Sequence, residues 1–158
     1  MKTVDFTKLN AAPAANTVNG LQQLLADFQV YYANLRGFHW NVKGKYFFHL
    51  HSKFEELYDD ASGKIDEIAE RILMLDGVPA HTFSDYLRVS KVKETGVVTN
   101  GEDGLKNVLE TLSLLIQSER AILKQASEAG DESTVAMMSD YLKEQEKTTW
   151  MLTAYFTN

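Results

Sequence analysis

The sequence predicts an all-α protein folded as one four-helix bundle. Two observations predict this fold: four long segments repeat their apolar residues with the period of an α-helix, and the only two prolines, Pro13 and Pro79, lie outside those segments. A length of 158 residues suits a single domain with a sizeable core, so residues 1–158 are expected to form one unit. Residues 1–15 precede the first periodic segment and are expected to form a flexible N-terminal arm or to run along a neighbouring subunit.

The four periodic segments have recognisable starts and stops. They cover approximately residues 17–42, 47–75, 104–129 and 132–156. Asn16 is a suitable N-cap for the first segment and Gly44 a suitable stop. Gly77 and Pro79 close the second segment.

A longer connection separates the second segment from the third. Within it, residues 82–87 are expected to form a short extra helix and residues 90–101 an irregular stretch. Two helix pairs with short internal loops, joined by one long crossover, are the arrangement of ferritin-like bundles. The sequence therefore predicts a ferritin-like four-helix bundle with a short extra helix between its second and third helices.

Composition excludes several kinds of function. The chain has no cysteine, which excludes disulfides, thiolate metal sites and cysteine nucleophiles. Its net charge of -6 disfavours a phosphate-binding surface. No apolar run has the length of a signal-peptide core or of a membrane span, so a cytoplasmic location without membrane association is expected.

Five residues in the first and second segments carry the ligand types of a metal site. They are His39, His51, Glu55, Asp66 and Glu70. Imidazoles and carboxylates that leave coordination positions open suit iron(II). Glu55 follows His51 by four residues, so this pair shares one face of the predicted helix. Asp66 and Glu70 have the same spacing and share a face in the same way.

The distance between the two pairs bears on assembly. His51 and Asp66 are 15 residues apart in the sequence, which corresponds to roughly 22 Å along a helix. One metal ion cannot touch both in a single chain. Either the two pairs are unrelated, or a second subunit completes the site.

A second subunit would place a two-fold axis near the middle of this helix. If the same helix of the partner crosses antiparallel, His51 meets Asp66 and two equivalent sites form per dimer. The axis then falls near Ala61, and the small residues there, which include Ser62 and Gly63, would allow two helices to approach closely. A glycine inside a helix otherwise costs about 1 kcal/mol relative to alanine.

Each candidate ligand also has an ordinary structural explanation when it is taken alone. His39, on a core-facing stripe, is more often a buried structural histidine, and His51 with Glu55 can be a surface pair. Asp66 and Glu70 can belong to a solvated helix face. The joint occurrence of all five at these spacings favours the metal site.

The other histidines are not expected to bind the metal. His49 lies about 200° around the helix from His51, and His81 lies in the long connection with no partner pattern. The chain also lacks the Glu-x-x-His motif of di-iron sites built inside one bundle. This absence argues against an intrasubunit di-iron oxygenase.

Residues 38–72, FHWNVKGKYFFHLHSKFEELYDDASGKIDEIAERI, closely resemble the signature of the Dps-type miniferritins, the dodecameric iron-oxidising relatives of ferritin. The order of the four long helices agrees with that family over most of the chain. The resemblance implies a ferroxidase site between two-fold related subunits. It takes His39, His51 and Glu55 from one subunit, and Asp66 and Glu70 from the other. Many family members have Asp where Glu55 stands, so direct or water-mediated binding by Glu55 stays open.

The resemblance also implies the chemistry. Iron is the implied metal cofactor and hydrogen peroxide the oxidant favoured over dioxygen, with ferric mineral stored in a hollow homododecamer as protection against oxidative stress. Trp40, beside His39, is a candidate sacrificial electron donor or an interface-packing aromatic residue. Asp131, Glu132 and Asp140 are candidates for lining an iron-entry pore, although acids near a helix start also have a purely structural explanation.

Two other classes of function compete with a ferroxidase. Some family members coat DNA through a lysine-rich tail, but here the N-terminal arm has only Lys2 and Lys8, against Asp5, and the C-terminus has no basic extension. DNA binding is therefore expected to be weak or absent. A DNA-protecting structural protein remains the alternative function, and a generic helical interaction module is the third class.

Overall fold

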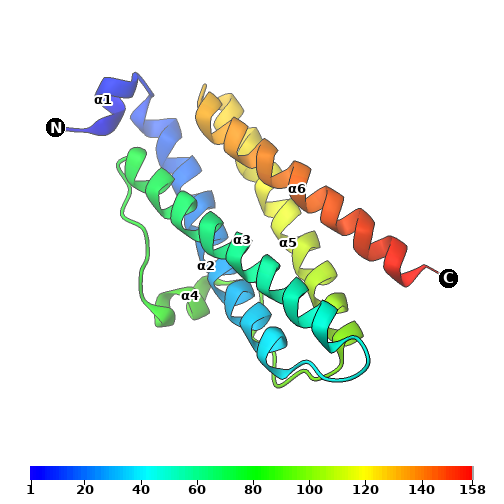
Figure 1. The fold of residues 1–158 in the computed structure, drawn as a ribbon. Coiled ribbons are helices and arrows are strands. Elements are labelled where there is room, and N and C mark those ends of the chain that lie inside the picture. Colours follow the sequence, from blue (N-terminus) through cyan, green and yellow to red (C-terminus); the bar gives the residue numbers. More distant parts are fainter. Residues whose placement is uncertain (158) are drawn as a thin grey trace.

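A computed structural model describes residues 1–157, and within that range it consists of helices and loops without a strand. Six helices follow one another: α1 (Thr3–Thr7), α2 (Ala11–Asn41), α3 (Phe47–Met74), α4 (Phe83–Val89), α5 (Gly101–Glu128) and α6 (Glu132–Phe156) (Figure 1). The four long helices form the bundle, and α4 is the extra helix in the crossover. The predicted all-α bundle is thereby confirmed.

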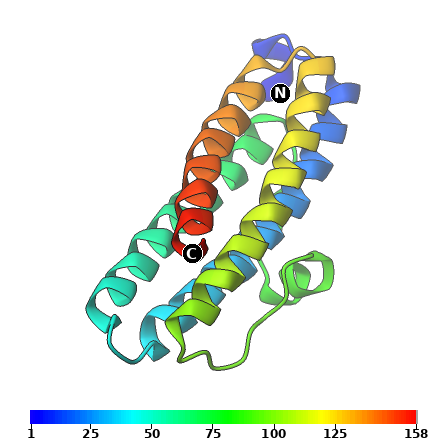
Figure 2. The same ribbon diagram turned by 90° about the vertical axis from the view of Figure 1, so that its right-hand side faces the viewer.

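Helix α2 is the central element of the bundle. It packs against α3 and against α5, and α5 packs in turn against α6, while the short α4 lies on α2. Each of the two consecutive pairs is an antiparallel hairpin, and the long crossover runs along the outside (Figures 1 and 2). On the remaining side, α3 and α6 line a groove of about 690 Å³.

The start of α5 packs very closely against α3. A Cβ atom added to Gly104 would lie 2.8 Å from Cζ of Phe54, and one added to Gly101 would lie 2.1 Å from Cδ1 of Leu50. A larger residue at either position would force the fully buried Phe54 or the partly buried Leu50 side chain to move. The helix begins at Gly101, earlier than the predicted residue 104, because Asn100 caps it by accepting bonds from two backbone N–H groups.

The start of α2 also differs from the sequence prediction. The helix begins at Ala11 rather than near residue 17, and Asn10 rather than Asn16 is its N-cap. Most of the added residues are alanine, the strongest helix former. Pro13 therefore lies inside the first turn, where its missing N–H has no helical acceptor to lose.

The short helix α1 is attached to the end of α3. The backbone N–H groups of Thr3 and Val4 donate to the carboxylate of Asp76 at 2.8 and 3.1 Å, and the Val4 side chain is buried. These two bonds, of which the one from Val4 has the larger effect, hold the pKa of Asp76 below its usual range. The flexibility expected of residues 1–15 stays a prediction, while residues 3–7 have a defined docking place on their own subunit.

Polar side chains of α2 hold the irregular part of the crossover. The buried carboxylate of Asp27 accepts bonds from Ser90 Oγ at 3.0 Å and from the backbone N–H of Lys91 at 2.6 Å. Two turns later, the Asn34 amide oxygen accepts the backbone N–H of Thr95 at 3.0 Å. The connection thus follows α2 because these side chains satisfy its backbone, as a loop without its own hydrogen bonds requires.

We expect Asp27→Ala to destabilise the protein by about 3 kcal/mol, because it removes a buried acceptor and leaves the backbone N–H groups of Lys91 and Val92 without a partner. Urea denaturation followed by circular dichroism measures the change. Glu146→Ala is the matched control, since its ion pair with Arg120 is exposed and should contribute below about 1 kcal/mol. Equal losses in the two variants would contradict this role of Asp27.

One carboxyl group lies entirely inside the bundle. Glu119 of α5 has no exposed surface, and its Oε1 accepts a bond from Gln145 Nε2 of α6 at 2.5 Å. The Glu119 Oε2 and Gln145 Oε1 atoms have no partner. Burial raises the pKa of Glu119 to about 7. A neutral carboxylic acid fits this pair, because its proton is a donor for the orphaned amide oxygen.

This burial predicts a pH dependence of stability. The unfolded carboxyl ionises near pH 4.5, whereas the folded one stays protonated up to about 7. Within that window the native state holds one more proton, so the free energy of unfolding falls as pH rises, by roughly 3 kcal/mol in all. Glu119→Gln should remove this slope, as measured by urea denaturation below and above the window at one protein concentration. An unchanged slope would show that other groups cause it.

Candidate metal centre

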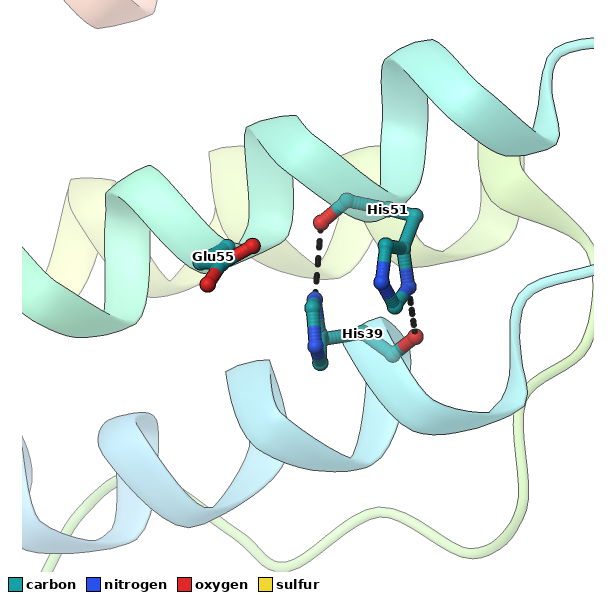
Figure 3. Close-up of side chains that lie close together, drawn as sticks. All are labelled: His39, His51 and Glu55. Atoms are coloured by element: carbon teal, nitrogen blue, oxygen red, sulfur yellow. Dashed lines mark hydrogen bonds between the residues drawn. The ribbon is translucent and has the colours of Figure 1, made fainter.

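Two histidines form the core of the site. His39 lies in the last turn of α2 and His51 in the first turns of α3, and the short loop at Gly44, whose φ is +104°, brings them face to face. Their rings stack with centroids 3.7 Å apart at an angle of 21°. Each ring uses its Nδ1 to contact the other residue's backbone carbonyl, at 2.8 Å for His39 and 2.9 Å for His51 (Figure 3).

The reciprocal bonds fix the chemistry of both rings. A carbonyl oxygen only accepts, so Nδ1 must carry the proton in each histidine. The lone pair is then on Nε2, which is the form that ligates a metal. A ring N–H donated to a backbone carbonyl is also the usual support of a metal-binding histidine. The two rings are therefore held in the tautomer that a metal ligand needs.

Glu55 completes a set of three on one subunit. It lies one turn beyond His51 on α3, and one ligand atom from each of His39, His51 and Glu55 lies within 4.8 Å of the others. Burial decreases through the set: His39 is 9% exposed, His51 is half-buried and Glu55 is exposed. The site thus opens toward solvent, and three protein ligands leave coordination positions free.

The structure does not bring the other two predicted ligands into this set. Asp66 and Glu70 are exposed on the same unbroken helix α3, far from the histidines along its axis. Within one subunit they cannot share an ion with His39. The intersubunit arrangement of the full set stays a prediction, and the exposure of both half-sites is what it requires.

The small residues at the predicted two-fold axis divide into two groups. Ala61 is fully buried against the core of its own subunit, so it cannot lie at a subunit contact, contrary to the prediction. It is 120° around the helix from Glu55. Ser62 and Gly63 are exposed, and nothing lies within 4 Å of a Cβ added to Gly63. Any close approach of a second α3 therefore depends on these two residues.

Aromatic residues that the sequence analysis did not single out surround the histidines. Tyr58 presents its edge to the His39 ring at 5.3 Å between centroids, and Phe47 stacks on His51 at 5.1 Å. Tyr32 in turn contacts Tyr58 at 6.0 Å. Burial first, and then the charges of nearby carboxylates, Glu55 foremost, raise the pKa of Tyr58. In the sequence, the sign of these aromatic surroundings was Tyr32, which lies seven residues before His39 on the same face of the predicted helix.

Trp40 lies beside the site but points outward. Its side chain is 62% exposed, and the Arg36 guanidinium lies over its ring at 4.5 Å from the centroid. The ring is thus covered by a cation on one face. Neither predicted role of Trp40, electron donor or interface aromatic residue, is decided by this position.

The predicted pore acids have different surroundings. Asp131 is buried, caps α6 through the Thr134 N–H, and accepts a bond from Arg71 Nη2 at 2.5 Å. Its carboxylate is occupied in joining α3 to α6 and is not free to line a pore. Glu132 and Asp140 are exposed, and for them the pore assignment stays a prediction. His49 and His81 are exposed and lie outside the group formed by His39, His51 and Glu55.

The chain is similar to known proteins in sequence and in fold. The family model of the ferritin-like domain matches residues 18–158. The "DNA protection during starvation protein" of Porphyromonas gingivalis is 53% identical over 156 residues, covering 99% of this chain and 98% of that protein. "General stress protein 20U" of Bacillus subtilis is 36% identical over 87% of this chain and 95% of its own length.

Solved structures give the same result. The crystal structure of the Dps protein from Vibrio cholerae O1, described as a ferritin-like diiron-carboxylate protein, superposes with a TM-score of 0.93 at 47% identity over 94% of both chains. Dps from Bacillus brevis has a TM-score of 0.89 at 34% identity over 94% of this chain and 100% of its own.

These matches define the chain first as a ferritin-like protein, because the family model covers nearly all of its bundle. Within that class it belongs to the Dps-type miniferritins. No helix among residues 1–157 is long and apolar enough to cross a membrane.

Proposed function

We propose that this protein oxidises Fe(II) at ferroxidase sites shared by two-fold related subunits and stores the ferric product in a hollow dodecamer. The observation that carries the proposal is the reciprocal pair of hydrogen bonds between His39 and His51, two stacked histidines that lie within ligand distance of Glu55. A ring N–H donated to a backbone carbonyl is the usual support of a metal-binding histidine, and here two adjacent histidines both have it. The description of the Vibrio cholerae relative as a diiron-carboxylate protein supports iron as the metal.

Each residue has a distinct part in the proposed reaction. Asp66 and Glu70 of one subunit and His39 of the other hold the first iron, since carboxylates favour a hard cation and neutralise its charge. His51 and Glu55 hold a second iron more weakly. The Glu55 side chain is one methylene longer than the Asp that many family members have at this position, and this difference allows Glu55 to bind iron through water. Fe(II) here is the substrate, so the open positions of the site admit both iron and oxidant.

Hydrogen peroxide is the proposed oxidant. Its reduction to two water molecules takes up two electrons and two protons, and two neighbouring Fe(II) ions supply the two electrons together. This pairing avoids the one-electron cleavage that releases a hydroxyl radical. A protein of this kind protects the cytoplasm against oxidative stress by consuming both reactants.

Storage of ferric iron requires an acidic surface next to the site where iron is oxidised. The groove between α3 and α6 contains Glu70, one of the proposed iron ligands, together with Glu67 of α3 and Asp140 and Glu144 of α6. In the proposed shell this groove faces the interior, where its carboxylates receive ferric ions. Asp140 then acts at the inner surface, whichever route iron takes to enter.

We expect complementation between two inactive variants to test the shared site. His39→Ala/His51→Ala and Asp66→Ala/Glu70→Ala should each lose peroxide-dependent iron oxidation, because each lacks one half of every site. When the two are unfolded and refolded together, half of the dimers are mixed, and each mixed dimer has one intact site. Activity should therefore return to roughly a quarter of the wild-type level, measured optically after anaerobic Fe(II) loading.

The control for complementation is Glu56→Ala, an exposed carboxylate of α3 whose partner is the exposed Lys53, and it should keep wild-type activity. Wild-type activity in Asp66→Ala/Glu70→Ala would refute the assignment of these ligands. A mixture as inactive as its components would refute the sharing of one site between subunits.

DNA protection is the second candidate function, because relatives with this name are among the most similar proteins. The charges of this chain do not favour direct binding. Its net charge is -6, and of the two lysines of the N-terminal arm Lys2 is close enough to Asp76 to lower that carboxyl's pKa. We propose that protection of DNA, where it occurs, follows from removal of iron and peroxide.

A gel-shift titration with linear duplex DNA tests this second candidate. At about 0.15 M salt we expect no retained complex, since few phosphate contacts are available and counterion release is small. A fusion of a lysine-rich tail to the N-terminus is the positive control and should bind. Tight binding by the unmodified protein at that salt concentration would make DNA coating a direct function.

A further inference from the structure

Tyr58 occupies a distinctive position at the metal centre. It lies one turn beyond Glu55 on α3, and its ring edge meets the His39 ring at 5.3 Å between centroids. It is half-buried, and no hydrogen bond in the described structure uses its hydroxyl. A packing role would be met equally well by phenylalanine, so the hydroxyl itself calls for an explanation.

The charges around Tyr58 favour the loss of an electron from its ring. Two exposed carboxylates lie close to it on α3: Glu55 precedes Tyr58 by about one turn, and Asp59 follows it directly. A net negative surrounding stabilises a developing positive charge on an oxidised ring. The ring is also in contact with a proposed iron ligand, which shortens the path of an electron.

The neighbouring aromatic residues have the opposite electrostatics. The guanidinium of Arg36 lies over Trp40 at 4.5 Å and over Tyr32 at 5.3 Å from the ring centroids. A cation on a ring face is attracted to the neutral ring and repelled by its radical cation. The Arg36 cation therefore disfavours oxidation of Trp40 and of Tyr32, whereas no cation lies over the Tyr58 ring in the described structure.

We propose that Tyr58, rather than Trp40, supplies the second electron to hydrogen peroxide when a site holds only one iron. The proposal rests on the peroxide-dependent ferroxidase function above. Fe(II) gives one electron and becomes Fe(III), while the Tyr58 hydroxyl gives one electron and one proton and becomes a neutral tyrosyl radical. With one further proton from water the O–O bond is cleaved and two water molecules form, so no hydroxyl radical is released. A later Fe(II) and a proton restore the tyrosine.

The test uses the assembled protein with fewer Fe(II) ions than sites, mixed with peroxide and frozen rapidly. Wild-type protein should show a tyrosyl radical by electron paramagnetic resonance, and the signal should narrow when the protein contains ring-deuterated tyrosine. Tyr58→Phe should lose this signal and release several-fold more hydroxyl radical to a spin trap. Tyr32→Phe, which removes the same group one ring further from His39, is the matched control and should behave as wild type.

Two results would overturn the proposal. One is an unaltered radical and spin-trap yield in Tyr58→Phe, and the other is loss of the radical in Trp40→Phe with no narrowing by deuterated tyrosine. If Tyr58→Phe does not assemble, peptide mapping of wild-type protein after repeated turnover decides, since oxidative modification should concentrate at Tyr58 and not at Trp40. Absence of any peroxide-dependent iron oxidation in wild-type protein would instead refute the ferroxidase function itself.

Discussion

The straightness of α3 is the constraint on which the proposed function of this protein depends. One unbroken helix from Phe47 to Met74 carries four of the five candidate ligands and holds its two ligand pairs a fixed distance apart. A helix cannot bend far enough to bring those pairs together without a proline or a break. Each subunit therefore exposes two incomplete half-sites. In the proposed function a partner subunit completes each half-site, which would couple metal binding to assembly.

The half-site with the histidines is ordered by its own subunit. The loop at Gly44 closes the α2–α3 hairpin, and the reciprocal bonds between His39 and His51 then fix both rings. Because each Nδ1 proton is donated to a carbonyl, the proposed binding of iron at Nε2 would require no change of tautomer. The half-site with Asp66 and Glu70 is exposed by contrast, and its carboxylates remain free to follow the ion.

Polar groups inside the bundle support this arrangement. Asp27 and Asn34 of α2 replace the missing backbone partners of the crossover, and Arg71 with Asp131 joins the ends of α3 and α6. These buried groups are satisfied, whereas the Glu119 carboxyl keeps an atom without a partner and stays neutral up to about pH 7. The bundle therefore combines polar contacts whose groups are all hydrogen-bonded with one contact, between Glu119 and Gln145, that depends on pH.

The sequence by itself determined the helical bundle and its crossover, because apolar periodicity is a local property of the chain. It also predicted five candidate ligands, of which the structure brings His39, His51 and Glu55 together. It misplaced the start of α2 and the orientation of Ala61, since caps compete within a few residues and a helix face is set by what packs on it. Only the tertiary structure decided the tautomers of His39 and His51, the burial of Asp131 and the position of Tyr58. Each of these depends on contacts between different helices, which spacing along one helix does not encode.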